Sequence, residues 1–168
     1  MPLTNISIKH LRCFDSINIS LSPGINFFYG ANGSGKTSML EAVFIFSSGK
    51  SFKSSNLGSL IKYEKENFYL KGFDNKKGYI VEVEKHKNKP ISIMLNNKKT
   101  VTSKLIKQFP CTPIHNNTFS FASAPPDFRR KLLDRSIFIA EEEFSSTWFS
   151  YHRTLKQRNA QLKNNRIS

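Results

Sequence analysis

The sequence has few acidic side chains and only two cysteines. Twelve aspartates and glutamates stand against twenty-six lysines and arginines in 168 residues, a formal net charge of +14. This balance favours an acidic partner, and nucleic acid is the first candidate. Cys13 and Cys111 are far apart and form neither a metal-ligand spacing nor a disulfide framework. Free thiols in a reducing compartment are therefore expected.

Long apolar runs and targeting signals are also lacking. The longest apolar run, residues 42–46, is far too short to cross a bilayer. The N-terminus has no basic-then-apolar pattern of a signal peptide. We therefore expect a cytoplasmic protein with no membrane partner. The length suits one domain, and a hydrophobic content of 38% with fifteen phenylalanines is enough to form a core.

The positive charge is concentrated in the middle of the chain. Residues 1–49 hold three basic and two acidic side chains, and residues 127–168 hold nine and five. Residues 50–107 hold fourteen lysines against five acidic residues, an excess of 14 − 5 = +9. This excess favours a surface that faces phosphates, with a solvated lysine-rich face as the plain alternative.

The clearest motif is a phosphate-binding loop of the form G-x-x-x-x-G-K-T. It consists of Gly30, Ala31, Asn32, Gly33, Ser34, Gly35, Lys36 and Thr37. Glycines allow successive backbone N–H groups to point at phosphate oxygens. The Lys36 ammonium suits the terminal phosphates, and the Thr37 hydroxyl suits Mg²⁺. The motif predicts a bound nucleotide with Mg²⁺.

The neighbouring segments fit this motif. Residues 24–29 are apolar and aromatic, which predicts a buried strand before the loop. Residues 38–46 predict a helix after it, whose N-terminus favours anions. One face of that helix carries Met39, Leu40, Val43 and Phe46. Gly49 is a natural cap for its carboxyl end.

Hydrophobic periodicity predicts the remaining elements. Strands are expected over residues 6–14, with a break near His10, and over residues 17–21, 67–73, 78–84 and 90–95. The last three form an antiparallel meander that carries most of the lysines. A loop and strand are expected over residues 110–121. Helical segments are expected over residues 57–63, 102–109, 128–138 and 141–163.

The last expected helix has two marked features. Glu141, Glu142 and Glu143 would form an acidic first turn that complements the helix dipole. An apolar stripe follows at spacings of three and four, which predicts a packing surface. The stripe consists of Phe144, Trp148, Tyr151, Leu155, Asn159 and Leu162.

Several segments, in order, resemble the RecF family of bacterial recombination mediators. The matching segments are residues 6–14, 23–26, 30–42, 48–53, 60–61, 125–134 and 151–160. The resemblance implies an α/β P-loop NTPase of the ABC-ATPase type, related to the SMC proteins. It implies a mixed sheet around the phosphate-loop helix, an antiparallel β meander and a carboxy-terminal helical pair.

The same resemblance implies a function in recombinational repair and replication. Members bind single-stranded DNA and linear duplex, favour gap junctions, help to load recombinase with other mediator proteins, and act in the SOS response. ATP is held between the two heads of a homodimer. Contacts with DNA phosphates are expected from the meander lysines and from Lys50, Lys53, Arg129 and Arg130.

The chain departs from the family pattern in length and in two motifs. It shows neither a Leu-Ser-Gly-Gly signature nor an apolar run ending in a Walker B aspartate. Family members are about twice as long, so the chain looks like an amino-terminal piece: a fragment, a truncated gene product or an isolated domain. Residues 1–123 would be the ATP-binding lobe, and residues 124–168 the start of a helical lobe.

These departures predict ATP binding with little hydrolysis, whereas the intact family member would be a slow ATPase. No catalytic residue is assigned. Glu41 is interpreted as an ordinary helix carboxylate rather than a general base. Arg12 either reaches the nucleotide, as its counterpart does in related heads, or serves packing and surface charge. Two alternatives stay open: a small P-loop kinase acting on a phosphorylated metabolite, and a non-enzymatic nucleic-acid-binding fragment.

Overall fold

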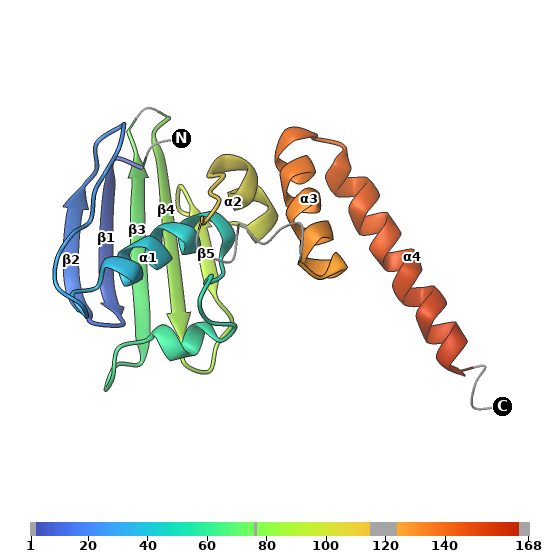
Figure 1. Cartoon of the computed structure of the whole chain (residues 1–168), viewed down its shortest axis with the longest axis horizontal. Coiled ribbons are helices and arrows are strands. Elements are labelled where there is room, and N and C mark those ends of the chain that lie inside the picture. The colour runs from blue at the N-terminus through green and yellow to red at the C-terminus, as the bar shows by residue number, and fades with distance from the viewer. Residues whose placement is uncertain (1–2, 76, 115–123, 165–168) are drawn as a thin grey trace. The chain divides into compact units, whose positions relative to one another are not determined.

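The computed structural model describes residues 3–75, 77–114 and 124–164 and separates the chain into two compact units, Met1–Pro113 and Ile114–Ser168 (Figure 1). Each unit is described by itself. The loop and strand predicted over residues 110–121 fall mostly outside the described residues.

One antiparallel sheet forms the framework of the first unit. Its order is β2-β1-β3-β4-β5-β6, with bounds β1 Asn5–Leu11, β2 Phe14–Ser20, β3 Asn67–Asp74, β4 Tyr79–His86, β5 Ser92–Leu95 and β6 Lys98–Lys99. Every second residue of β3 is buried, as period-two patterning requires. The five expected strands of this region are confirmed, β6 being an addition. All described pairings are antiparallel, so the parallel part of the expected mixed sheet is not among the described strands.

The break expected near His10 is real. His10 and Arg12 both have positive φ, 54° and 51°, and this turns the chain sharply from β1 into β2. A hydrogen bond to another segment stabilises the turn: the Arg12 amide donates to the Leu60 carbonyl at 2.7 Å.

Helix α1 (Lys36–Ser48) crosses one face of the sheet (Figure 1). The short helix α2 (Thr102–Gln108) packs beside α1, and the 3-10 turn η1 (Leu57–Leu60) contacts β4. The core lies between α1 and the sheet and includes Phe46 and Leu70. Gly72 permits this close approach, because a Cβ there would lie 3.2 Å from the Phe46 ring.

The apolar face of α1 is wider than the sequence predicts. Leu40, expected on that face, is 52% exposed, whereas Glu41 and Ala42 are buried. The cause is that α1 contacts the sheet and also α2, so more than one stripe is covered. The Gly49 cap is confirmed: its φ is 60°, and its amide donates to the Ile45 carbonyl at 2.8 Å.

Residues 24–29 do not form the buried strand that their sequence predicts. Ile25, Phe27 and Tyr29 are 78%, 83% and 92% exposed, and no described strand pairs with this segment. A strand needs a neighbour to bond its backbone N–H and C=O groups. None of the described strands provides that neighbour, so the segment is unpaired.

The described residues of the second unit form helices α3 (Pro126–Ala140) and α4 (Phe144–Asn164), neither of which has a buried residue. Pro126 stands in the first turn of α3, as expected. The three glutamates precede α4 instead of forming its first turn. The Glu143 carbonyl accepts the Ser146 amide at 3.2 Å, so Glu143 caps the helix and the other two glutamates lie before it.

Candidate nucleotide-binding site

The loop between residues 29 and 36 has the backbone that its glycines predict. Gly30, Gly33 and Gly35 have φ of 147°, 85° and 95°, values that side chains with a Cβ rarely adopt. Gly35 is also required for packing. A Cβ there would lie 2.6 Å from Phe14 Cζ and 2.8 Å from Cys13 Sγ. The turn between β1 and β2 therefore packs directly against the end of the loop.

Lys36 holds the loop closed from within. Its Nζ donates to the Gly30 carbonyl at 2.9 Å and to the Ala31 carbonyl at 2.8 Å. An ammonium has three donors, so one donor is left over from these two bonds. That donor suits a phosphate oxygen held over the loop.

The amino end of α1 adds a second set of donors. The first amides of a helix have no intrahelical acceptor and carry a partial positive charge. The helix begins at Lys36, and the Met39 amide already donates to the Gly35 carbonyl at 2.9 Å. Helix dipole, glycine loop and ammonium thus favour the same ligand, a polyphosphate.

Thr37, the predicted Mg²⁺ ligand, is exposed on the first turn of α1. Within the described part of the chain, no group of three or more His, Cys, Asp or Glu side chains could hold a metal ion. A hydroxyl alone binds Mg²⁺ weakly, because the ion prefers six oxygens and often takes them from water and substrate phosphates. Mg²⁺ at Thr37 would therefore arrive with the nucleotide.

Glu41 lies one helical turn after Thr37 and is completely buried. Its two oxygens accept from the Arg12 guanidinium, Nε at 2.9 Å and Nη2 at 3.2 Å. The Ser51 hydroxyl donates to Glu41 Oε1 as well. A carboxylate with both oxygens occupied is poorly placed to take a proton from water, so Glu41 is structural here. Arg12 packs against Glu41 with its side chain 34% exposed.

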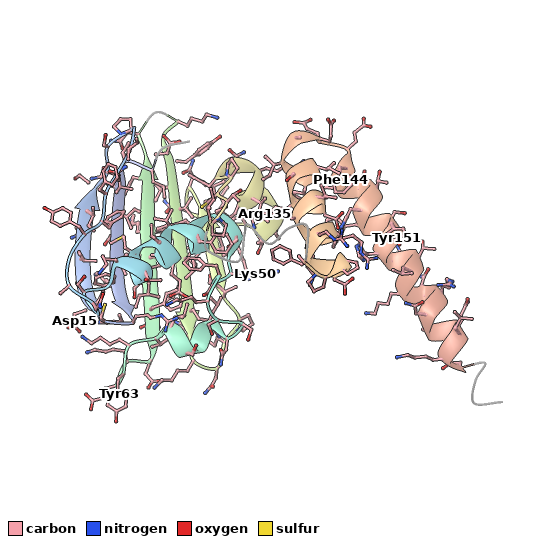
Figure 2. The ribbon with its side chains drawn as sticks, in the orientation of Figure 1. Asp15, Lys50, Tyr63, Arg135, Phe144 and Tyr151 are labelled. Atoms are coloured by element: carbon pink, nitrogen blue, oxygen red, sulfur yellow. The ribbon has the colours of Figure 1, made fainter. Side chains whose placement is uncertain are left out.

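The residues predicted to contact DNA lie in both units. Lys50 and Lys53 are exposed on the loop that follows α1, and Lys50 stands just beyond the end of that helix (Figure 2). Arg129 is half-buried on α3. Arg130 is exposed and pairs with Asp127 at 2.5 Å.

The lysines of the meander lie both on its strands, as Lys71 and Lys85 do, and at its turns, as Lys87 and Lys89 do. The outer face of the strands is mixed in charge. Glu82 lies there between Tyr69 and Lys71, accepting from the Tyr69 hydroxyl and pairing with Lys71 Nζ at 3.1 Å. The hydrogen bond from Tyr69 lowers the Glu82 pKa below its usual value, and desolvation raises the Tyr69 pKa. This face is therefore less suited to a phosphate backbone than the lysine count alone suggests.

Three hollows are alternative candidates for a ligand-binding site. One of about 530 Å³ lies between α3 and α4, and one of about 420 Å³, near Phe46 and Pro110, has no charged side chain in its lining. A hollow of about 210 Å³ flanks the phosphate loop, with Phe14, Ile17 and Lys36 in its walls. We take the loop as the site because only there do glycine backbone, helix N-terminus and ammonium converge.

The sequence patterns give Ser51 no role, although its hydroxyl contacts Glu41. The two residues are 10 positions apart in the sequence. Ser51 lies on the loop after α1, so the periodicity of a helix or strand does not relate it to Glu41. Only folding of the loop after α1 brings them together.

A protein-family model described as "AAA domain" matches residues 5–167. The chain belongs to the AAA-domain family. The match runs through the phosphate loop and continues across both units of this AAA domain.

The resemblance to RecF is confirmed by curated relatives. The DNA replication and repair protein RecF of Pseudoalteromonas translucida (strain TAC 125) is 34% identical over 166 residues, which is 97% of this chain and 46% of that protein. That of Actinobacillus pleuropneumoniae serotype 5b (strain L20) is 36% identical over 165 residues. The chain thus spans about half the length of the curated relatives it matches.

Solved structures confirm the fold. The structure described as "the recombination mediator protein RecF-ATPrS in RecFOR pathway" has a TM-score of 0.84 and 27% identity over 97% of this chain and 45% of its own. An SMC ATPase structure has a TM-score of 0.63 at 18% identity, covering 79% of this chain and 98% of its own. The predicted P-loop fold of the ABC-ATPase type is therefore confirmed.

Proposed function

We propose that the chain binds ATP, with Mg²⁺, at residues 30–37 and that it is the ATP-binding part of a DNA replication and repair protein. The observation that carries the proposal is the loop itself: three glycines with positive φ, and Lys36 held at 2.9 Å and 2.8 Å by two loop carbonyls. Relatives named for replication and repair, and a similar RecF structure whose description includes ATP, support it.

DNA is the proposed second ligand. The net charge of +14 favours it, and Lys50 and Lys53 offer exposed cations close to α1 in the chain. Arg129 and Arg130 are proposed as contacts from the second unit. Backbone contacts of this kind hold DNA without reading its sequence. The proposed DNA is single-stranded DNA, linear duplex or a gap junction. The proposed role is to help load recombinase, together with other mediator proteins, in the SOS response.

Hydrolysis is proposed to be slow and to require a homodimer of the intact protein. Phosphoryl transfer to water needs a residue that orients the attacking water. Glu41, the carboxylate just after the loop, is engaged by Arg12 and Ser51. We therefore expect the isolated chain to bind ATP with little or no turnover. Robust Mg²⁺-dependent hydrolysis by the purified chain would contradict this expectation.

The test of the nucleotide site is ATP binding by the wild-type chain and by Lys36→Ala, each with and without Mg²⁺. Loss of a charge-assisted bond to phosphate should weaken binding about 10- to 100-fold. Lys53→Ala is the matched control and should bind ATP like the wild type. Equal binding by all three proteins would refute the site and favour a nucleic-acid-binding fragment that uses charge alone.

The test of DNA binding is the dependence of affinity on salt, measured with a single-stranded oligonucleotide. Replacing both Lys50 and Lys53 by alanine should reduce the slope of log affinity against log salt by about 1.4, because each phosphate contact contributes about 0.7. The control replaces Lys98 and Lys99 of β6, which removes the same charge elsewhere. An equal change in both double variants would point to net charge rather than to local contacts.

A further inference from the structure

We propose that Glu41 is a positioning residue that couples the nucleotide loop to the loop carrying Lys50 and Lys53. The inference rests on the proposed function, since it presumes that ATP and DNA bind at these two places. It assigns a role to three residues that contact one another: Arg12, Glu41 and Ser51.

Ser51 organises the lysine-bearing loop. Its hydroxyl donates to Glu41 Oε1 and accepts the backbone amides of Lys53 and Ser54, both at 2.9 Å. A hydroxyl has one donor and two acceptor sites, so every bonding site of Ser51 is used. The backbone at Lys53 is therefore held on α1 through a single side chain.

Arg12 connects the same carboxylate to the phosphate loop. Its guanidinium forms two hydrogen bonds with Glu41, a geometry that fixes orientation as well as distance. The next two residues, Cys13 and Phe14, fill the space beside Gly35. A continuous set of contacts thus runs from Gly35 through the β1–β2 turn and Glu41 to Ser51.

The burial of Glu41 makes this connection stiff. A buried carboxylate must keep its partners, because losing one leaves a charge without compensation. If nucleotide binding shifts the β1–β2 turn or α1, Ser51 would therefore move with Glu41, because the buried carboxylate cannot exchange its partners for water. The expected result is a coupling between ligands, which by linkage acts equally in both directions.

The experiment measures ATP affinity with and without a saturating single-stranded oligonucleotide, and takes the ratio of the two. In the wild type the ratio should differ from one by about fivefold or more. Ser51→Ala should bring it to within twofold of one, with each ligand alone still bound. Ser51→Thr keeps the hydroxyl and should restore the wild-type ratio.

Ser54→Ala is the matched control. Its hydroxyl lies in the same loop but bonds the Asn56 carbonyl and the Ser59 hydroxyl instead of Glu41, so the ratio should stay as in the wild type. A wild-type ratio in Ser51→Ala, or a ratio of one in a wild type that binds both ligands, would overturn the coupling and leave the proposed function standing. Failure of the wild type to bind ATP or DNA would overturn both.

Discussion

Helices α1 and α4 differ sharply in burial, although apolar residues at helical spacing predicted both. Of the 13 residues of α1, nine are buried, whereas none of the 21 residues of α4 is. Both segments show apolar residues at helical spacing, and both form helices. The difference lies in what surrounds them: α1 is covered by the sheet and by α2, whereas α4 contacts α3 along one stretch. Periodicity therefore predicts a helix but not its burial.

The stripe predicted on α4 is used only in part. Phe144, Trp148 and Leu155 line the hollow that α4 shares with α3, and the Trp148 indole N–H donates to Asp134 at 2.9 Å. Leu162, farther along the stripe, is 49% exposed. The prediction of a packing surface is thus met for the first half of the helix among the described residues.

The largest expected difference between the units concerns apolar truncation. Leu70→Ala in β3 removes a fully buried side chain and should lower the free energy of unfolding by about 2–5 kcal/mol. Leu162→Ala on α4 should change it by less than about 0.5 kcal/mol, because the site is half-exposed. Urea unfolding followed by circular dichroism measures both. Similar losses in the two variants would contradict the contrast between the units.

The next prediction compares the loss of stability when a buried ion pair and an exposed ion pair are broken. Glu41→Ala leaves Arg12 without its partner and should destabilise the first unit by about 2 kcal/mol, below the usual cost because Arg12 is partly exposed. Glu66→Ala removes the exposed partner of Lys87 and should cost less than about 0.5 kcal/mol. Thermal unfolding compares them, and equal midpoints would argue that Glu41 is not buried in solution.

A smaller effect can be observed in the second unit alone. The only tryptophan of the chain is Trp148, so its fluorescence reports on α3 and α4. Asp134→Ala removes the acceptor of the indole N–H and should cost about 1 kcal/mol. The emission transition in urea should move to lower concentration, while Leu70→Ala leaves it in place if the units unfold independently. A common shift in both variants would show that the two units unfold together.

The smallest effect is a pH dependence at the outer face of the sheet. The folded-state pKa of Glu82 is lowered, first by the Tyr69 hydrogen bond. Its contribution is therefore present above the unfolded value of about 4.5 and disappears as pH falls through the lower, folded pKa. Glu82→Gln should lower the free energy of unfolding by less than about 1 kcal/mol at pH 7. It should also make that free energy fall less steeply as the pH drops below 4.5. An unchanged steepness would contradict this assignment, and Glu143→Gln near α4 is the control.

The local sequence predicted the backbone of the phosphate loop better than it predicted the segments that flank the loop. Gly30, Gly33 and Lys36 act within a few residues of one another, so the motif is sufficient to place them. Ser51 contacts Glu41 only because the chain turns back after α1. No sequence motif or periodicity predicts that contact. Residues 24–29 have the composition of a strand, but strand formation requires a paired neighbour, which depends on chain far away in sequence.

The sequence by itself determined the phosphate loop, the alternation of the strands, the helix ends at Gly49 and Pro126, and the likeness to RecF. These features depend on backbone freedom and on side-chain spacing, which are local properties. Only the tertiary structure decided that Leu40 is exposed and that Glu41 is buried between Arg12 and Ser51. Burial and charge pairing depend on which segments meet in space, and distances along the chain do not determine that.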